Sequence, residues 1–416
     1  MNITFLIGNG FDINLGLKTR YTDFYPYYLK KHPEEMIAKF ISQDNNYENW
    51  ADLELGLGNM LKLVPKDKSE EFLDSKGILE ECLTKYLKQQ NKLFSIKDSE
   101  KAFDYFKNSL IGFYNEFNDE ENVKYNRMIR TYREDVNFSF ITFNYTDTLD
   151  RIIKKNQDKN RNIGTYRNDF SEIHSMRVTV PLHIHGTLEN SMVLGVNDES
   201  QIANESLKKD REFQNYFIKQ KVLTELGERK LTKAKDIIDN SNYVCLFGLS
   251  IGDTDSYWWA YLIEWLNRDK NNRLVIYTIG KNDTSFSAQQ RLRNRDSKRQ
   301  HMLKQAKCKK DEIIETIFGR IIVINNSKIF NIPGIVIEKE QSDSQLQLVY
   351  RDSREVLPAM SKVITELAKS TSELFDGVSS AQINTQELKK DDDNDLNGII
   401  LSEDEDNGQV KDADGE

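Results

Sequence analysis

Short unbroken runs of apolar residues recur along the chain, and each ends in glycine or polar residues. The runs are 3–7 (ITFLI), Asn137–Asn144, Val178–Ile184, Tyr243–Phe247, Leu274–Ile279 and Ile321–Ile324. Runs of Val, Ile, Leu and Phe without apolar–polar alternation are typical of strands buried on both faces of a parallel sheet. Helical patterns, such as Tyr257–Leu266 and Ser285–Lys310, separate most of the runs. This order predicts an α/β fold with a parallel sheet.

The segment Thr19–Arg130, between the first two predicted strands, is too long and too helical for a simple crossover. Its aromatic residues recur at helical spacing, which is typical of core packing. We therefore expect a large helical insertion at about 19–130 that covers the carboxyl edge of the sheet. Trp50 and Glu54 share one face of a predicted helix there, four residues apart. We expect Glu54 to be exposed on that helix and not to reach the site.

The first strand runs directly into Gly8-Asn9-Gly10-Phe11-Asp12. A strand, a glycine turn and a helix start can bind the phosphates of a nucleotide. The glycines let the backbone approach closely, and the N–H groups of the helix point at the anion. Gly8 and Gly10 match the dinucleotide fingerprint, but its third glycine is missing. The alternative is a tight strand-to-helix turn that binds nothing.

Glycines and polar residues follow the carboxyl ends of four predicted strands. They are Gly8, Gly10, Asp12, Asn144, Asp147, His185, Gly186, Ser250 and Asp253. Each also has a structural explanation, since Asn144 or Asp147 can cap a helix and His185 can be a half-buried core histidine. In parallel sheets, however, the carboxyl ends of the strands share one edge, and ligands bind there. We therefore expect these residues to gather at one edge.

Composition narrows the class of protein. The chain has 416 residues, 38% of them hydrophobic and 30% charged, which allows an ample core in a rather polar protein. No apolar run reaches the roughly 20 residues that span a bilayer, and the amino terminus lacks the basic start of a signal peptide. Cys82, Cys245 and Cys308 lie too far apart in sequence for a disulfide framework or a CxxC zinc pair. We expect a cytoplasmic protein without a membrane partner or a metal.

The formal net charge of −9 is concentrated at the carboxyl terminus. Gln386–Glu416 holds twelve acidic residues and three lysines, a sum of −9, so the remainder of the chain is neutral. A neutral body argues against nucleic acid as a partner, because such binding relies on neutralising phosphates. The acidic segment has little to bury, and we expect a disordered tail over 376–416.

The region before the tail, 331–375, is predicted to be a strand and helix extension of an α/β domain at 1–330. Its expected elements are strands at Ile335–Glu338 and Leu346–Tyr350 and a helix at Val356–Leu374. Nothing in the sequence assigns it a function.

Four motifs in this order resemble the bacterial AbiH family, named for abortive infection of bacteriophage. They are GNGFD at 8–12, FNYTDTLD at 143–150, LHIHGTL at 182–188 and GLSIGDTDSYW at 248–258. The AbiH pattern in turn resembles the sirtuin-like Rossmann domain, in which a glycine turn, an Asn after a strand, a His-Gly pair and a Gly-x-Ser loop surround NAD. The resemblance covers most of 1–330 and implies a sirtuin-like α/β domain that takes NAD as its substrate.

The resemblance also implies roles for single residues. Gly8 and Gly10 correspond to the turn against the pyrophosphate, and Ser250 to a contact with phosphate or ribose. Asn144 corresponds to the residue that contacts the nicotinamide-side ribose and holds the attacking water, and His185 to a base acting on a ribose hydroxyl. The implied catalytic residues are therefore Asn144 and His185. The implied NAD-contacting residues are Gly8, Asn9, Gly10, Phe11, Asp12, Asp147, Gly186, Gly248, Ser250 and Asp253.

Two positions depart from the patterns. AbiH proteins usually carry Gly-His-Ser where this chain has Gly248-Leu249-Ser250, although the glycine and serine remain. Sirtuin-like NAD hydrolases often read Asn-Tyr-Asp, whereas here Thr146 follows Tyr145 and the acid moves to Asp147. This shift puts an acid role for Asp147 in doubt.

The implied reaction is hydrolysis of NAD to ADP-ribose and nicotinamide. Nicotinamide leaves as a good cationic leaving group, so the site needs a placed water, a base and exclusion of solvent rather than a strong acid. Sirtuin deacetylases hold a structural zinc with four cysteines, and three cysteines cannot do so. The resemblance implies a toxic NAD hydrolase that is quiet until infection, as a homo-oligomer or with a partner protein.

Three alternatives stay open. The site could bind NAD or ADP-ribose as a sensor without turnover. It could hydrolyse with a metal, since His183 and His185 alternate on a strand and Asp147 or Asp253 could add ligands. It could also be a nuclease, because Ser285–Lys310 holds nine Lys or Arg and a single acid, and a basic helix can hold a phosphate backbone.

Overall fold

The computed structural model describes most of the chain up to residue 338. The described ranges are 1–43, 52–154, 161–190, 192–227, 229–278 and 287–338. They belong to one compact unit, Met1–Glu340. The strand expected at Leu346–Tyr350 and the helix expected at Val356–Leu374 lie outside the described residues, as does the tail.

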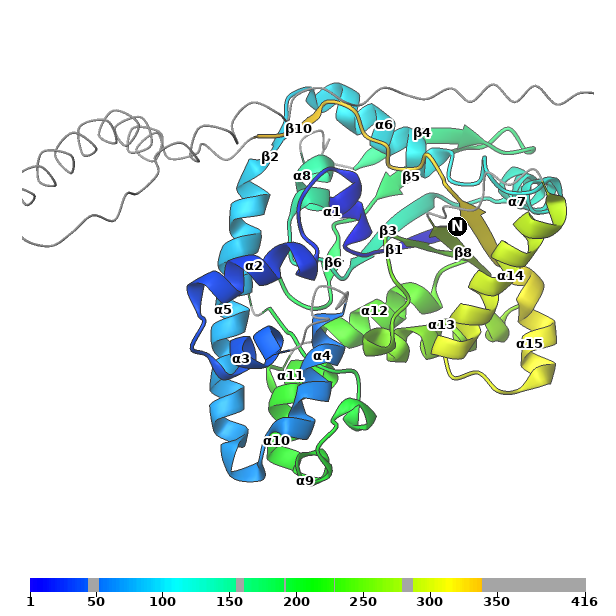
Figure 1. The fold of residues 1–416 in the computed structure, drawn as a ribbon. Helices are drawn as coiled ribbons and strands as arrows, with labels where there is room; N and C mark the ends of the chain where they lie inside the picture. The colour runs from blue at the N-terminus through cyan, green and yellow to red at the C-terminus, as the bar shows by residue number, and fades with distance from the viewer. Residues whose placement is uncertain (44–51, 155–160, 191, 228, 279–286, 339–416) are drawn as a thin grey trace, which may run out of the picture. The chain divides into compact units, whose positions relative to one another are not determined.

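An eight-stranded sheet forms the centre of this unit, in the order β4-β5-β3-β1-β7-β8-β9, with β6 paired to β3 (Figure 1). Its strands are β1 (Asn2–Ile7), β3 (Val136–Thr142), β4 (Asn162–Arg167), β5 (Ile173–Val178), β6 (Leu182–His183), β7 (Tyr243–Phe247), β8 (Arg273–Thr278) and β9 (Ile321–Asn325). Every pair is parallel except β4–β5. The six parallel strands β5-β3-β1-β7-β8-β9 follow the 3-2-1-4-5-6 order of doubly wound α/β sheets. The predicted fold class, a mixed α/β protein with a mostly parallel sheet, is therefore correct.

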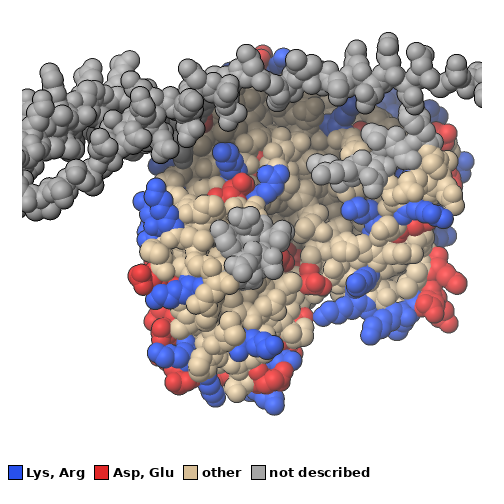
Figure 2. Space-filling model, in the orientation of Figure 1, with Lys and Arg blue, Asp and Glu red and all other residues tan. Residues whose placement is uncertain are grey.

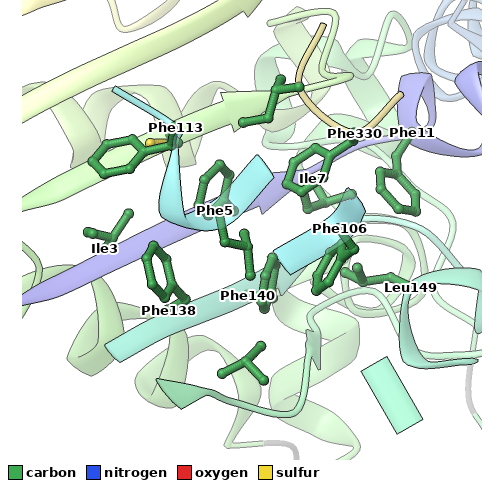
Figure 3. Packing of buried hydrophobic residues seen from close by; sticks show 14 of the residues in the cluster. Ile3, Phe5, Ile7, Phe11, Phe106, Phe113, Phe138, Phe140, Leu149 and Phe330 are labelled. Carbon is green, nitrogen blue, oxygen red and sulfur yellow. The ribbon is translucent and has the colours of Figure 1, made fainter. Parts of the chain in front are cut away.

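Central strand β1 is buried on both faces, as its apolar run predicts. Ile3, Phe5 and Ile7 face one apolar cluster, and Leu6 faces another. On the first face, Phe5 stacks on Phe140 at 5.8 Å between ring centroids. Figure 3 shows the rings of α6 and of the segment before β10 that close over it. Helices therefore cover both faces of the sheet.

The helices separate into sheet-covering helices and a second layer at one side (Figure 1). Helices α1 (Gly10–Asn14), α6 (Ser99–Ile111), α7 (Asp119–Thr131) and α8 (Thr148–Lys154) belong with one face. Helices α12 (Lys230–Asp239), α13 (Ser256–Arg268), α14 (Ala288–Gln305) and α15 (Asp311–Ile317) belong with the other. The second layer has α2 (Tyr21–Lys31), α3 (Met36–Gln43), α4 (Leu53–Met60), α5 (Ser69–Leu93), α9 (Glu205–Lys208), α10 (Arg211–Phe217) and α11 (Lys219–Glu225).

This second layer joins two segments that are distant in sequence. Helices α2 to α5 share one apolar core with α9 to α11, and Tyr145 and Leu188, from the carboxyl edge of the sheet, pack against it. The helices of the segment at about 19–130 lie in two different places. Its first helices pack beside the carboxyl edge, whereas α6 packs on a face of the sheet.

The predicted strand Val178–Ile184 is wrong as a single strand. Strand β5 ends at Val178 and β6 contains only Leu182–His183. Pro181 lies between them and lacks the N–H that a ladder needs. The predicted strand at Ile335–Glu338 is confirmed as β10 (Ile335–Ile337), which pairs with β2 (Phe94–Ile96) in a separate two-stranded sheet. In the described part of the chain, every helix is too short or too polar to cross a membrane.

Candidate functional site

The glycine turn after β1 packs directly on the loop after β7. The Gly8 N–H donates to the Phe247 carbonyl at 2.9 Å, and the Gly10 N–H donates to the Gly248 carbonyl at 2.8 Å. A Cβ on Gly10 would lie 2.5 Å from the Gly248 Cα, and Gly248 itself has φ +70°. This contact joins β1 and β7, the two strands between which the strand order reverses. In doubly wound sheets ligands bind at that reversal.

Asn9 and Phe11 make contacts within the protein. The Asn9 side chain exchanges two hydrogen bonds with Thr19, one to the Thr19 carbonyl at 2.8 Å and one from its hydroxyl at 2.5 Å. The Phe11 ring is buried, edge-on to Phe247 at 6.3 Å. Helix α1 has five residues, so its amino end is a short turn rather than a long helix aimed at the site.

Asp12 is the centre of a buried polar network. Its carboxylate is 1% exposed and accepts the hydroxyl protons of Thr146 and Thr148, each at 2.5 Å. The Asn144 side chain is a third partner. Burial raises the pKa of Asp12 to about 6, against the effect of these three hydrogen bonds. The network ties the turn after β1 to the loop after β3, so Asp12 and Asn144 do lie together.

His183 extends this network through both ring nitrogens. Nδ1 lies 2.9 Å from the Asn144 carbonyl oxygen, and Nε2 lies 2.9 Å from Asp150 Oδ2. Both neighbours are acceptors, which favours a proton on both nitrogens and therefore the charged form of the ring. Burial acts to lower the pKa of His183, but the Asp150 carboxylate outweighs it and raises the pKa above its ordinary value. His183 fixes the backbone at Asn144.

His185 has very different surroundings. Its side chain is 8% exposed, and its ring stands edge-on to Phe143 at 5.3 Å. Nε2 lies 3.6 Å from Asp255 Oδ1. Burial, followed by the nearby Lys219 ammonium, lowers the pKa of His185 to about 3. The imidazole is therefore neutral at physiological pH, and it is a weaker base than the sequence-based role assumes.

A buried ionic cluster lies next to His185. Lys219 Nζ is 2.8 Å from Glu54 Oε2 and 2.8 Å from Asp255 Oδ1. Burial raises the pKa of Glu54 to about 7. For Asp255, Lys219 outweighs burial and lowers the pKa. The prediction that Glu54 is exposed is wrong, because Glu54 is 6% exposed and faces Lys219.

The motif acids Asp147 and Asp253 are both exposed. Asp147 accepts a hydrogen bond from Asn91 of α5 at 2.8 Å, so its carboxylate is bonded outside the buried network around Asp12. Ser250 is also exposed. Ile251, which follows Ser250, has φ +54°, an unusual backbone conformation for a β-branched residue. A cavity of about 280 Å³ opens beside Asp253; its other lining residues are Leu55, Asn59, Ser200, Gln201, Ala203, Ser256 and Lys307.

The proposed metal ligands do not converge. Strand β6 ends at His183, Gly186 has φ +88°, and the two histidines have different partners, Asp150 for His183 and Asp255 for His185. Among the residues that the structure describes, no three His, Cys, Asp or Glu side chains are grouped so that they could hold a metal ion.

The structure brings some of the predicted residues into contact with one another. Contacts link the glycine turn to Gly248, Asp12 to Asn144, and Phe143 to His185. Glu54, Lys219 and Asp255 were not predicted as site residues. Asp255 lies within the GLSIGDTDSYW motif, where its position before a helix is typical of a helix-capping residue. Lys219 lies in none of the four motifs.

Fold and site together define a doubly wound α/β protein with a polar, largely buried site at the carboxyl edge of its sheet. Comparison with known protein families matches residues 4–277 to the family described as bacteriophage abortive infection AbiH. The chain belongs to this family, which suggests a role in abortive-infection defence against bacteriophage. No curated protein matches the chain.

Proposed function

We propose that this AbiH protein is a defence effector that hydrolyses NAD at the bond between nicotinamide and ribose. The main support is the reversal of the strand order between β1 and β7, where doubly wound sheets bind ligands, with Asn144 and His185 following the nearby strands β3 and β6. A dinucleotide lying across this reversal has its phosphates near the glycines and its nicotinamide ribose towards β3 and β6.

The proposed reaction is compatible with a neutral His185. The glycosidic bond breaks with its electron pair moving to the pyridinium nitrogen, which leaves neutral nicotinamide and an oxocarbenium ion. Water held by Asn144 attacks this cation and forms the new C–O bond, and its proton passes to His185 or to solvent. Attack on so strong an electrophile needs only a weak base, so a low pKa of the imidazole slows the step but does not prevent it. Burial of the site limits competing water.

A second candidate, a sensor that binds NAD or ADP-ribose without turnover, is favoured by one observation. The pKa of His185, lowered to about 3, makes it a poor general base in this conformation. On this proposal, binding of NAD or ADP-ribose at the carboxyl edge changes the second helical layer, and no bond of the ligand is cleaved.

Cellular NAD during induced expression tests the two proposals. The hydrolase predicts that NAD falls and nicotinamide and ADP-ribose appear with the wild-type protein, but not with Asn144→Ala or His185→Ala at equal protein level. Purified protein incubated with NAD, followed by chromatography, then assigns the products. Unchanged NAD in expressing cells during phage infection, together with calorimetric binding of NAD, would identify the sensor instead.

A further inference from the structure

Asp255 occupies a helix-capping position but does not cap the helix. It is the N-cap residue of α13, and its side chain makes no capping hydrogen bond there. An Asp at this position usually accepts a hydrogen bond from a backbone N–H of the first turn, which stabilises the helix. Here the carboxylate instead accepts a hydrogen bond from Lys219 and faces His185. The Asp255 carboxylate therefore faces the candidate site rather than the first turn of α13.

The cluster holds Asp255 in one place and leaves it accessible. Glu54 and Lys219 are nearly fully buried, with side chains 8% and 4% exposed, whereas the Asp255 side chain is 21% exposed. Lys219 Nζ bridges the two carboxylates at 2.8 Å each. A charge pair buried in this way fixes its members firmly, because removing one partner leaves the other uncompensated. The accessible member is therefore a preoriented carboxylate.

His185 is the second half of the arrangement. Within the described residues, neither ring nitrogen makes a hydrogen bond, and Asp255 Oδ1 lies 3.6 Å from Nε2. A neutral imidazole carries one donor and one acceptor, and both of these groups on His185 are available to a ligand. A ligand hydroxyl satisfies both groups, since it can donate to the carboxylate and accept from the imidazole N–H.

We propose that Asp255 and His185 together bind a ribose hydroxyl of the ligand, with Lys219 and Glu54 holding the Asp255 carboxylate in position. This proposal rests on the proposed function in taking NAD as the ligand. It makes Asp255 the acid of the site, rather than Asp147 or Asp253. Asp147 is exposed and accepts a hydrogen bond from Asn91, and Asp253 is exposed and lines the cavity of about 280 Å³.

The test measures binding without turnover. The probes are carba-NAD, in which a methylene replaces the ring oxygen of the nicotinamide-side ribose so that no oxocarbenium ion forms, and its analogue without the two hydroxyls of that ring. Calorimetry with the wild-type protein is expected to give at least about tenfold tighter binding of carba-NAD, as one good hydrogen bond to a charged group provides. Asp255→Asn is expected to reduce this difference below about threefold.

Asp104→Asn, at an exposed aspartate of α6 that pairs with Lys107, is the matched control and is expected to keep the wild-type difference. If Asp255→Asn does not fold, His185→Gln serves in its place, with the same expected loss. The proposal is overturned if the wild-type protein binds both probes equally or not at all. It is also overturned if Asp255→Asn discriminates like wild type, or if the loss follows Asp253→Asn or Asp147→Asn instead. Hydroxyl-dependent binding without NAD loss in cells would refute the hydrolase and leave this site standing.

Discussion

At the residue scale, two histidines separated by one residue have opposite electrostatic surroundings. His183 donates from both nitrogens to acceptors, so the folded state favours its charged form. His185 lies buried near an ammonium group, so the folded state favours its neutral form. The chemistry of each follows from its neighbours rather than from the residue type.

These shifts predict opposite pH dependences of stability. Because the folded pKa of His185 is about 3, against an ordinary value near 6.5, its contribution is complete above pH 6.5 and is lost as the pH falls towards 3. For His183, whose folded pKa is raised, the contribution is complete below about 6.5 and is lost as the pH rises through the folded pKa.

Urea unfolding of wild type, His183→Gln and His185→Gln between pH 4 and 8 measures the contributions of both histidines to stability. The free energy of unfolding of wild type minus that of His185→Gln should increase with pH, and the corresponding difference for His183→Gln should decrease. Asp12 and Glu54 titrate in the same window and are present in all three proteins, but the His183 charge lowers the pKa of Asp12, so the His183→Gln difference measures the His183–Asp12 pair together. Two flat differences would contradict this interpretation.

The buried Asp12 carboxylate gives a second prediction. Thr148→Val removes one of its hydroxyl donors without changing side-chain size much. We expect a loss of about 1–3 kcal/mol of unfolding free energy at pH 8, where Asp12 is ionised, and a smaller loss at pH 5, below its pKa of about 6. Chemical denaturation at the two pH values measures this.

The control for that prediction is Thr316→Val, on the exposed face of α15, where the hydroxyl bonds only to the backbone of its own helix. It should change stability by less than about 0.5 kcal/mol at either pH. Equal losses of unfolding free energy for Thr148→Val at pH 5 and pH 8 would show that the Thr148 hydroxyl does not stabilise the charged form of Asp12.

At the element scale, the sequence predicts best where burial acts on both faces of a strand. The run Tyr243–Phe247 coincides with β7, and Leu274–Ile279 lies within one residue of β8. Strands β4 and β5 were missed because they are half-exposed and mix polar with apolar residues, so they carry no apolar run. Local pattern thus locates the buried strands, including the edge strand β9, and fails for the half-exposed pair β4 and β5.

The same reasoning explains the partial success at the site. Asn144 and His185 directly follow strands, and strand direction alone brings them to the carboxyl edge. Lys219 comes from a short helix in the second layer, and its partners Glu54 and Asp255 are 165 and 36 residues away. Pairing over such separations depends on tertiary packing of apolar helices, which no local spacing reveals.

A third prediction concerns the contact between the loops after β1 and β7. Gly10→Ala places a methyl group 2.5 Å from the Gly248 Cα, a backbone atom that cannot move without shifting β7. We expect it to cost about 1–3 kcal/mol, as overpacking does. Gly77→Ala, in the middle of α5 with open space around its Cβ, should instead stabilise the protein by roughly 0.5–1 kcal/mol. Thermal unfolding of both variants checks this; destabilisation of similar size in both would remove the argument for close backbone packing.

At the scale of the whole molecule, the distribution of charge does not favour nucleic acid as a general binding partner. The net charge of −9 arises within Gln386–Glu416, so the preceding residues sum to zero. On the face in Figure 2, basic and acidic side chains are intermingled. Helix α14 is the exception, since Asp296 is its single acid, and that residue pairs with Arg299.

This distribution gives the last prediction. The inner side of α14 is committed to the fold, because Met302 and Leu303 are buried and Arg299 donates to the Ile321 carbonyl of β9. Its outer side can offer only a few phosphate contacts, and each lowers the slope of log K against log salt by about 0.9. We therefore expect DNA and RNA oligomers to bind weakly at 50 mM salt and not measurably at 150 mM.

Fluorescence anisotropy across this salt range, with a variant carrying Arg293→Gln, Lys298→Gln and Lys304→Gln, checks the prediction. These three side chains are exposed on α14, and their substitution should remove the low-salt binding while leaving the thermal unfolding temperature unchanged. Tight binding at 150 mM salt that this variant loses would place a phosphate-binding surface on α14 and favour the nuclease. Weak binding that vanishes with salt would argue against a phosphate-binding surface on α14 and against the nuclease.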